Sequence, residues 1–181
     1  MNEAKGITTA RVAELLEDFT PAEVARLLDV SRNTIAYHAK KAGYVSPQEQ
    51  VRELLPWQDL TPEDNRAWPY RMVYSHLEYM VTGGRTMSND KLEKLAQFYE
   101  GTIIEFDTVV EFDPNIWPAP GRKYGRWQYT PRRPEDENLI VRINKYTRIP
   151  DANRDMFRLP KRWPVVEGGN GSTRSDHRGG V

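Results

Sequence analysis

Three adjacent side chains in the first quarter of the chain have the types needed to read base edges in duplex DNA. Arg32 can bond N7 and O6 of guanine as a two-pronged fork, and Asn33 can bond N6 and N7 of adenine. Thr34 can offer its methyl group to thymine or its hydroxyl group to a phosphate. From Ser31 to Val45 there are three cations and no acid. Because a merely solvated helix more often mixes charges of both signs, this stretch is predicted to face nucleic acid.

The other polar residues of this stretch suit the phosphates and the edge of the groove. Ser31 starts the predicted helix, where its hydroxyl group or backbone N–H can meet a phosphate. The remaining candidates are Tyr37, His38, Lys40 and Lys41. Two of them have an alternative of equal weight: Tyr37 could pack against the preceding helix, and His38 could be an ordinary surface histidine.

Residues 19–43 supply the two helices and the turn that would position these side chains. Thr20 is a suitable N-cap, and Glu23 stands three residues later, as in a capping box. A tight turn is expected at 29–31, and Gly43 is expected to end the second helix. The pattern predicts a helix-turn-helix, in which the first residues of the second helix touch base edges. A helical hairpin with a purely structural role is the alternative.

A second cluster, in the C-terminal half, interleaves cations with aromatic side chains. Its members are Arg122, Lys123, Tyr124, Arg126, Trp127, Tyr129, Arg132 and Arg133. Such mixtures are common on nucleic-acid surfaces, because Arg and Lys meet phosphates while aromatic rings pack or stack. Arg71 and Arg85 flank the preceding pair of helices and could add to the same surface. The alternative is a β-hairpin with a solvated basic face.

The chain of 181 residues has a formal net charge of zero, but the charge is unevenly distributed. Residues 87–113 hold two cations and seven acids, a net charge of −5, whereas residues 120–165 hold twelve cations and five acids, a net charge of +7. A basic face can therefore meet phosphate while the acids lie elsewhere. The absence of cysteine excludes disulfides, thiolate zinc sites and cysteine nucleophiles. With no signal peptide and no apolar run near the ~20 residues of a membrane span, a soluble cytoplasmic protein is expected.

The hydrophobic periodicity predicts a mainly α protein with a small β part, of the α+β class. Helices are expected over about 10–18, 47–55, 70–81 and 89–99, with a break at Pro69 and an end at Gly101, and strands within 103–112 and 127–130. The run 139–143 fits a strand or a helical turn equally well. The predicted organisation is a helix-turn-helix domain at 1–56, a linker at 57–69, a helical and β-hairpin domain at 70–165, and a disordered tail at 166–181.

Four carboxylates raise the question of metal-dependent chemistry. They are Glu105, Asp107, Glu111 and Asp113. Glu105 and Asp107 are two positions apart, as are Glu111 and Asp113, so the two members of each pair would share one face of a strand. Such carboxylates can hold Mg²⁺. No nucleophile motif accompanies them, and the polar side of an antiparallel sheet accounts for them more simply. His76, among aromatic residues on a helix, is expected to be packed and hydrogen-bonded. We therefore expect no metal site, no cofactor and no enzymatic activity.

Two runs, residues 29–43 and 127–142, resemble the immunity repressors of temperate mycobacteriophages, an actinobacteriophage family with an N-terminal helix-turn-helix. The stretch 103–114 also resembles phage-encoded DNA-binding proteins. The resemblance implies a transcriptional repressor that maintains lysogeny in the cytoplasm of the host bacterial cell. It also implies double-stranded DNA as the partner, with an early lytic promoter and many related asymmetric sites as targets.

Binding to asymmetric sites favours a monomeric protein. No leucine-rich heptad predicts a dimer, and one helix-turn-helix reads only a few base pairs, so both domains are expected to engage one duplex. Two alternatives stay open. The second half could be catalytic, as in a recombinase, transposase or nuclease, or it could bind a protein partner such as RNA polymerase.

Overall fold

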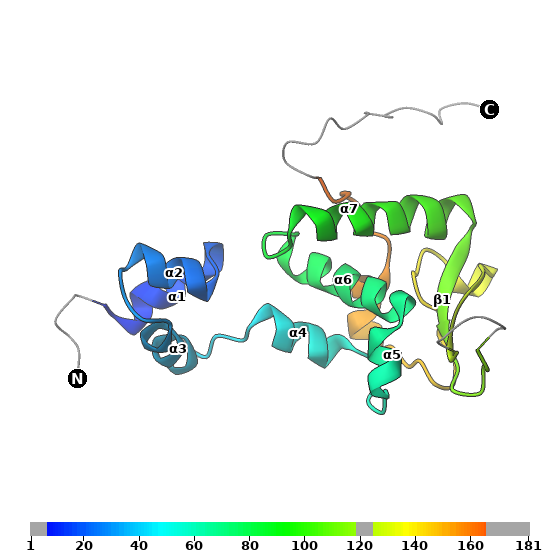
Figure 1. Ribbon diagram of the computed structural model, residues 1–181, viewed down its shortest axis with the longest axis horizontal. Coiled ribbons are helices and arrows are strands. Elements are labelled where there is room, and N and C mark those ends of the chain that lie inside the picture. Colours follow the sequence, from blue (N-terminus) through cyan, green and yellow to red (C-terminus); the bar gives the residue numbers. More distant parts are fainter. Residues whose placement is uncertain (1–6, 119–124, 166–181) are drawn as a thin grey trace. The chain divides into compact units, whose positions relative to one another are not determined.

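The structure is a computed structural model that describes residues 7–118 and 125–165. Its elements are α1 Thr9–Asp18, α2 Pro21–Leu27, α3 Arg32–Lys41, α4 Pro47–Leu54, α5 Pro62–Arg66, α6 Trp68–Thr82, α7 Asn89–Gln97, η1 Phe98–Glu105, β1 Thr108–Phe112, β2 Trp127–Pro131, η2 Pro134–Asp136 and η3 Asp151–Phe157 (Figure 1). Helices predominate and the two strands pair, which confirms the predicted α+β class. No helix within the described ranges is long and apolar enough to cross a membrane.

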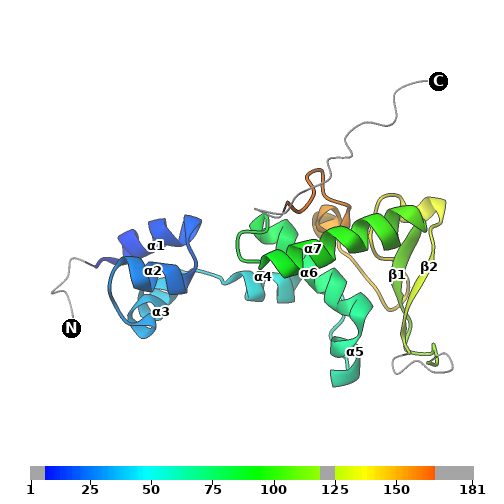
Figure 2. The ribbon, with the colours of Figure 1, turned by 45° about the horizontal axis from the view of Figure 1, so that its top comes forward.

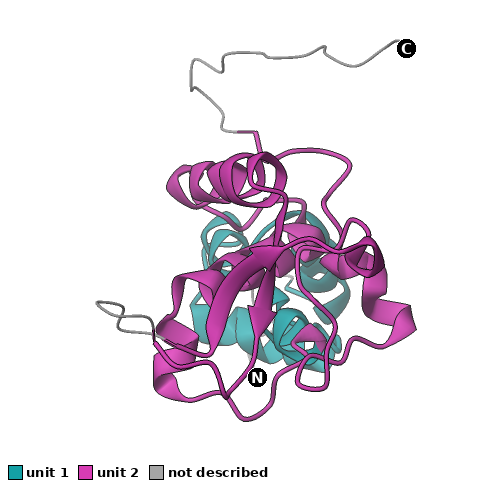
Figure 3. Ribbon diagram, turned by 90° about the vertical axis from the view of Figure 1, so that its right-hand side faces the viewer, with its two compact units in different colours: residues 1–53 teal, residues 54–181 magenta. Residues whose placement is uncertain are grey.

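The chain forms two compact units, residues 1–53 and 54–181, drawn in different colours in Figure 3. The first unit holds the stretch predicted to read bases, and the second holds the sheet. The tail at 166–181, predicted to be disordered, lies outside the described residues. The assignment of 1–56 and 70–165 as two DNA-binding domains stays a prediction.

In the first unit, α1, α2 and α3 pack around one apolar core. Val12 and Leu16 of α1 meet Val24 of α2 and Ile35 of α3, and all four side chains are buried. The two α1 residues are four positions apart, so they lie on one face of that helix. Thr8 caps α1, because its hydroxyl oxygen accepts a backbone N–H of the first turn at 3.2 Å. The core thus holds α3 by the face opposite its polar residues.

The start of α2 and the turn between α2 and α3 both have the predicted geometry. The Thr20 hydroxyl accepts the N–H of Glu23 at 3.3 Å, and the Glu23 carboxylate accepts the N–H of Thr20 at 2.8 Å, which confirms the capping box. Asp29 has a positive φ of 50°, and the N–H of Val30 donates to the carbonyl of Ala25 at 3.0 Å. A left-handed residue reverses the chain sharply, and Asp tolerates this conformation better than most residues.

The end of α3 is fixed by Gly43, whose φ is 72°. The N–H of Tyr44 donates to the carbonyl of Ala39 at 2.9 Å, and the N–H of Gly43 donates to that of Lys40 at 3.1 Å. These bonds satisfy the last carbonyl groups of the helix, as glycine-ended helices commonly do. The predicted helix end at Gly43 is confirmed.

In the second unit, the break predicted at Pro69 lies two residues earlier, at Ala67. Pro69 is the second residue of α6, where its missing N–H would have no partner within the helix. Ala67 is extended, with φ −61° and ψ 136°, and it is buried. The helix α6 then runs to Thr82 and ends at Gly83, whose φ is 63°.

Helical structure continues through Gly101, so the predicted end of the helix there is wrong. The helix α7 passes directly into η1, a π-helical segment. Phe98, Tyr99 and Ile103 are buried along this segment, and their packing outweighs the tendency of one glycine to interrupt a helix. The strand expected from residue 103 consequently begins only at Thr108.

The strands β1 and β2 form an antiparallel ribbon, seen side by side in Figure 2. Val110 lies opposite Tyr129, and Phe112 lies opposite Trp127. The undecided run 139–143 is extended where Val141 bridges to Val110 in parallel. The N–H of Val110 donates to the carbonyl of Ile140 at 2.8 Å, so chain that follows the ribbon in sequence lies alongside β1.

The stretch 57–69, assigned to a linker from the sequence, contributes α5 and Trp57 to the second unit. Trp57 is buried, and its Nε1–H donates to the hydroxyl of Thr147 at 2.9 Å. Its ring centroid lies 6.2 Å from that of Phe112 and 4.8 Å from that of Trp127. This aromatic cluster joins the start of the unit to the end of the ribbon.

A buried histidine connects α6 with η1 and η3. His76 has its Nδ1 2.7 Å from the Tyr99 hydroxyl and its Nε2 2.8 Å from the carbonyl of Met156. Because a carbonyl only accepts, Nε2 carries the proton and Nδ1 accepts the hydroxyl hydrogen of Tyr99. Burial lowers the pKa of His76 from 6.5 to about 4. The ring is therefore a neutral, packed and hydrogen-bonded side chain, as expected from the sequence.

Candidate nucleic-acid interface

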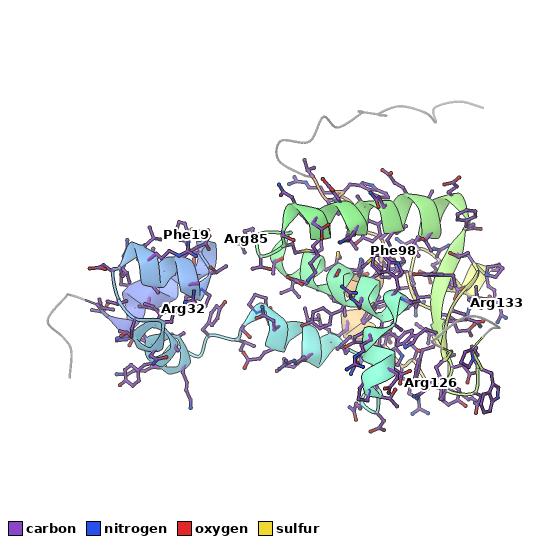
Figure 4. The ribbon with its side chains drawn as sticks, in the orientation of Figure 1. Phe19, Arg32, Arg85, Phe98, Arg126 and Arg133 are labelled. Atoms are coloured by element: carbon purple, nitrogen blue, oxygen red, sulfur yellow. The ribbon has the colours of Figure 1, made fainter. Side chains whose placement is uncertain are left out.

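One face of α3 is exposed and carries most of the residues predicted to read bases. The exposed residues that share this face are Arg32, Asn33, Ala36, Tyr37 and Lys40. Their spacings of one, three and four residues fit a single stripe on a helix of 3.6 residues per turn. Figure 4 labels Arg32 at the start of α3. Buried Ile35 and Ala39 hold the helix from the other side. The stripe offers a guanidinium group, an amide, a phenol and an ammonium group together.

Ala36 lies in the middle of this stripe and was not among the residues predicted from the sequence. An alanine carries no polar atom, so its type gives no functional signal. Its position between Asn33 and Lys40 is informative, because a methyl group is small enough to let a binding partner approach the helix closely. Alanine can also contact the methyl group of thymine. Exposure on a polar helix face would have been the signal to find it.

The first turn of α3 uses two of the predicted contact residues for its own cap. The Ser31 hydroxyl accepts the N–H of Thr34 at 3.1 Å, and the two hydroxyl oxygens lie 2.9 Å apart. Ser31 is nevertheless exposed, so its hydroxyl group stays accessible. The contacts with phosphate or bases predicted for this pair would add to the capping bonds.

His38 lies away from the exposed stripe. Its Nδ1 is 3.0 Å from the hydroxyl oxygen of Thr9 in α1, and the contact is partly buried. His38 thus joins α1 to α3. Tyr37, whose ring meets the His38 ring edge-on at 5.2 Å, is 63% exposed and belongs to the stripe. Lys41 is exposed beside it.

A hollow of about 470 Å³ opens between α2 and α3. It is lined by Ala22, Ala25, Arg26, Asp29, Val30, Ser31 and Arg32. Arg26 and Arg32 are exposed cations on this surface, and Asp29 is the acid among its lining residues. Arg26, which the sequence analysis did not select, therefore extends the cationic surface from α3 onto α2.

In the second unit, Arg126 is engaged by the protein itself. Its Nη1 lies 2.6 Å from a carboxylate oxygen of Asp64, which is 3% exposed and belongs to α5. The guanidinium group also lies 5.1 Å from the ring centroid of Phe112. Figure 4 shows Arg126 beside α5. Arg126 therefore ties the β-hairpin to a helix, and a DNA contact by it stays a prediction.

Arg132 is bound more completely than Arg126. Its guanidinium donates to the Asp107 carboxylate at 3.1 Å, and to the carbonyls of Glu137, Leu139 and Thr108 at 2.6, 2.8 and 3.2 Å. Those bonds use four of the five N–H donors of the guanidinium group, so this arrangement favours a structural role. The neighbouring Arg133 is exposed.

The other predicted cations of the second unit are spread over its surface. Arg71 is exposed, and its guanidinium carbon lies 5.9 Å from the ring centroid of Trp68. Arg85 is exposed in the connection after α6, where its Nε donates to the carbonyl of Thr82 at 3.1 Å. Figure 4 shows Arg85 at one end of the unit and Arg133 towards the other. Arg122 and Lys123 lie outside the described residues.

A basic turn at residues 144–148 was missed from the sequence. The Asn144 side-chain oxygen accepts the N–H groups of Tyr146 and Thr147 at 2.8 and 2.9 Å, which organises the turn. Lys145 and Arg148 are exposed on it. The run Asn-Lys-Tyr-Thr-Arg has the same mixture of cations and an aromatic ring as the cluster at 122–133. That mixture was the sequence feature from which this basic turn could have been predicted.

The four carboxylates considered for metal chemistry are not arranged as expected. Glu105 lies in η1, and Asp107 has a positive φ of 47°, so neither is on a strand. Glu111 accepts from Gln128 at 2.9 Å and lies 3.6 Å from Arg142. Within 7–118 and 125–165, no group of three or more acidic or histidine side chains is placed to hold a metal ion.

Arg142 is held in the interior by a second acid. Its Nη2 lies 2.7 Å from a carboxylate oxygen of Asp136, and both side chains are buried. Burial alone would raise the pKa of Asp136, but hydrogen bonds from Arg142 and from the backbone of Arg133 outweigh it and hold the pKa below its ordinary value. This ion pair fixes the segment after β2 and takes one cation out of the basic C-terminal half.

Comparison with known proteins identifies a curated relative. A protein of Mycobacterium phage L5, described as a repressor-like immunity protein, is 32% identical to this chain over 146 residues, which are 79% of each protein. No model of a known protein family matches the chain. The aligned length exceeds either compact unit alone, so the likeness extends into both.

Proposed function

Because the chain belongs to the family of phage repressor-like immunity proteins, we propose that it is a sequence-specific repressor of transcription that binds double-stranded DNA. It maintains the immunity of a lysogenic host cell, acts in that cell's cytoplasm and needs no cofactor. The observation that carries the proposal is the exposed stripe on α3. A rigid helix there presents Arg32, Asn33, Tyr37 and Lys40 around a small residue.

The proposed reading of DNA follows from this stripe. We assign residues 21–41 to a helix-turn-helix and place α3 in the major groove, with Arg32 on guanine and Asn33 on adenine. Lys40 and Arg26 meet phosphates on either side. The left-handed Asp29 and the cap at Ser31 set the angle at which α3 leaves the turn.

The second unit supplies the rest of the footprint in this proposal. One helix-turn-helix reads only a few base pairs, and two linked modules bind more tightly than either alone. The exposed cations of residues 54–165 then meet phosphates beside the site read by α3. One chain on one duplex produces an asymmetric site, because no symmetric partner reads a second half. Two chains per site in sedimentation would contradict this part of the proposal.

Selection of DNA by the full-length protein tests the main proposal. Duplexes are enriched from a random-sequence pool, and the affinity for the enriched site is measured by fluorescence anisotropy. Arg32→Ala and Asn33→Ala should each weaken binding by about 1–3 kcal/mol and relax the preference at one base position. Arg52→Ala, which removes an exposed cation of α4, is the matched control. Failure to enrich any sequence, or unchanged affinity in both stripe variants, would refute the proposal.

A further inference from the structure

Trp117 is a large apolar side chain that the protein does not bury. It is 88% exposed, more than any other large hydrophobic residue of the described ranges. A tryptophan left in water gives up one of the largest apolar contributions that a side chain can make to folding. Exposed single leucines or valines need no explanation, but a nearly bare indole is uncommon.

The backbone that carries Trp117 is held firmly. Beyond the paired ends of β1 and β2, the N–H of Asp113 donates to the carbonyl of Arg126 at 2.8 Å, and the N–H of Arg126 donates to that of Ile116 at 2.8 Å. The N–H of Ile116 in turn donates to the carbonyl of Asp113 at 3.1 Å. The residue directly before Trp117 is therefore fixed to both sides of the hairpin.

Gly125 brings the opposite side of the hairpin against the same segment. A β-carbon at this position would lie 2.6 Å from the carbonyl oxygen of Ile116 and 2.6 Å from the nitrogen of Pro118. Both atoms belong to the backbone and cannot move aside easily, so only glycine permits this approach. Residues 116–118 are thus packed on Gly125, and the indole projects from a backbone that has little freedom.

A side-chain contact places the basic turn next to this platform. The Asp113 carboxylate accepts the N–H and the side-chain amide of Asn115 at 2.8 and 2.9 Å. The same amide group donates to the Tyr146 hydroxyl at 2.5 Å. Lys145 and Arg148, the exposed cations of the turn at 144–148, therefore lie on the same end of the unit as Trp117. Of the nearby acids, Asp64 is paired with Arg126, whereas Asp113, held by Asn115, keeps its charge. A hydrogen bond to Tyr146 raises the pKa of Lys145, and the charge of Asp113 adds to that rise.

We propose that Trp117 is a DNA-contact residue of the second unit, which packs its indole against the sugar and base surface of a groove. Lys145 and Arg148 bind the phosphates beside it. This inference rests on the proposed function, because it requires a duplex as the partner. The backbone that carries the ring is held before binding, so contact costs little backbone conformational freedom, and apolar wedges between base steps are an established means of holding DNA.

The dependence of DNA affinity on salt concentration distinguishes the contribution of the Trp117 ring from that of the two cations. Binding of the full-length protein to the enriched duplex is measured by anisotropy over a range of salt concentrations. Trp117→Ala should weaken binding about tenfold at every salt concentration and leave the log–log slope unchanged, because no phosphate contact is lost. The double variant Lys145→Ala, Arg148→Ala should weaken binding and lower that slope by about two phosphate contacts.

Control variants isolate the position of the ring. Phe106 is 71% exposed on the same unit but stands between Glu105 and Asp107, so Phe106→Ala should bind DNA as the wild type does. Trp117→Phe should retain part of the affinity. Gly125→Ala keeps the indole but displaces its platform, and should lose affinity while near-ultraviolet circular dichroism confirms a folded core.

The possible failures are distinguishable. If the wild-type protein binds no duplex, the proposed function fails, and the inference fails with it. If the wild type binds DNA and Trp117→Ala binds equally well, only the inference is overturned. Loss of binding to a bacterial protein partner in Trp117→Ala, with DNA affinity unchanged, would also overturn it and would assign the indole to a protein interface.

Discussion

Protonation of His76 should destabilise the second unit in mild acid. Its folded-state pKa of about 4 lies below the ordinary value of 6.5, because burial disfavours the charged ring. The unfolded chain therefore binds the proton more readily, and stability falls as the pH drops from about 7 towards 4. Between about pH 7.5 and pH 4.5 the loss attributable to this residue is about 2–3 kcal/mol. The charged ring would also have to donate from Nδ1, where the Tyr99 hydroxyl now donates to it.

The assay uses urea unfolding followed by tryptophan fluorescence. All five tryptophans lie within residues 54–181, so this signal reports on the second unit alone. The control is His76→Gln, which cannot take up the proton. It should be less stable near neutral pH, but its stability should fall less over the same interval. The pKa of Asp136 lies below its ordinary value, so protonation of this and similar acids lowers the free energy of unfolding of both proteins only at still lower pH. Equal losses in wild type and variant, or a His76 pKa near 6.5 by NMR titration, would refute the reasoning.

Three further predictions concern single positions. Asp136→Ala should lower the free energy of unfolding by about 3 kcal/mol, because it removes the closer of the two acids that pair with buried Arg142 and leaves only Glu111, 3.6 Å away; a loss below about 1 kcal/mol in urea unfolding would contradict this. Asp29→Gly should raise the stability of the first unit by several tenths of a kcal/mol, because glycine adopts the left-handed conformation without strain, and no rise in the melting temperature by circular dichroism would argue against it. Lys40→Ala should reduce the slope of log affinity against log salt by about one, whereas Asn33→Ala should change base preference and leave that slope unchanged.

Local chemistry made the first unit predictable. The capping box at Thr20 and Glu23 and the glycine end at Gly43 depend on residues within one or two helical turns, and a short window of sequence contains all of them. The stripe on α3 follows from helical periodicity alone. His38 is the exception, since its partner Thr9 lies 29 residues away and no local pattern reveals it.

Long-range packing limited what could be predicted for the second unit. Gly101 and the run after it resembled a helix end followed by a strand, but burial of Tyr99 and Ile103 keeps that segment helical. Trp57 resembled part of a linker because its partner Thr147 lies 90 residues away. The cations of the C-terminal half predicted a basic surface, but charge alone could not reveal that Arg132 and Arg142 bind inward.

The bond between Trp57 and Thr147 has a consequence for the order in which the chain folds during synthesis. The core that holds α3 is formed with α1 and α2, which precede it in sequence, so α3 can be complete soon after this part leaves the ribosome. The second unit needs Thr147 for the bond to Trp57. It also needs Met156 for the bond to His76, and Met156 lies 80 residues after His76 in the chain. A chain interrupted before that point would present α3 without a finished second unit.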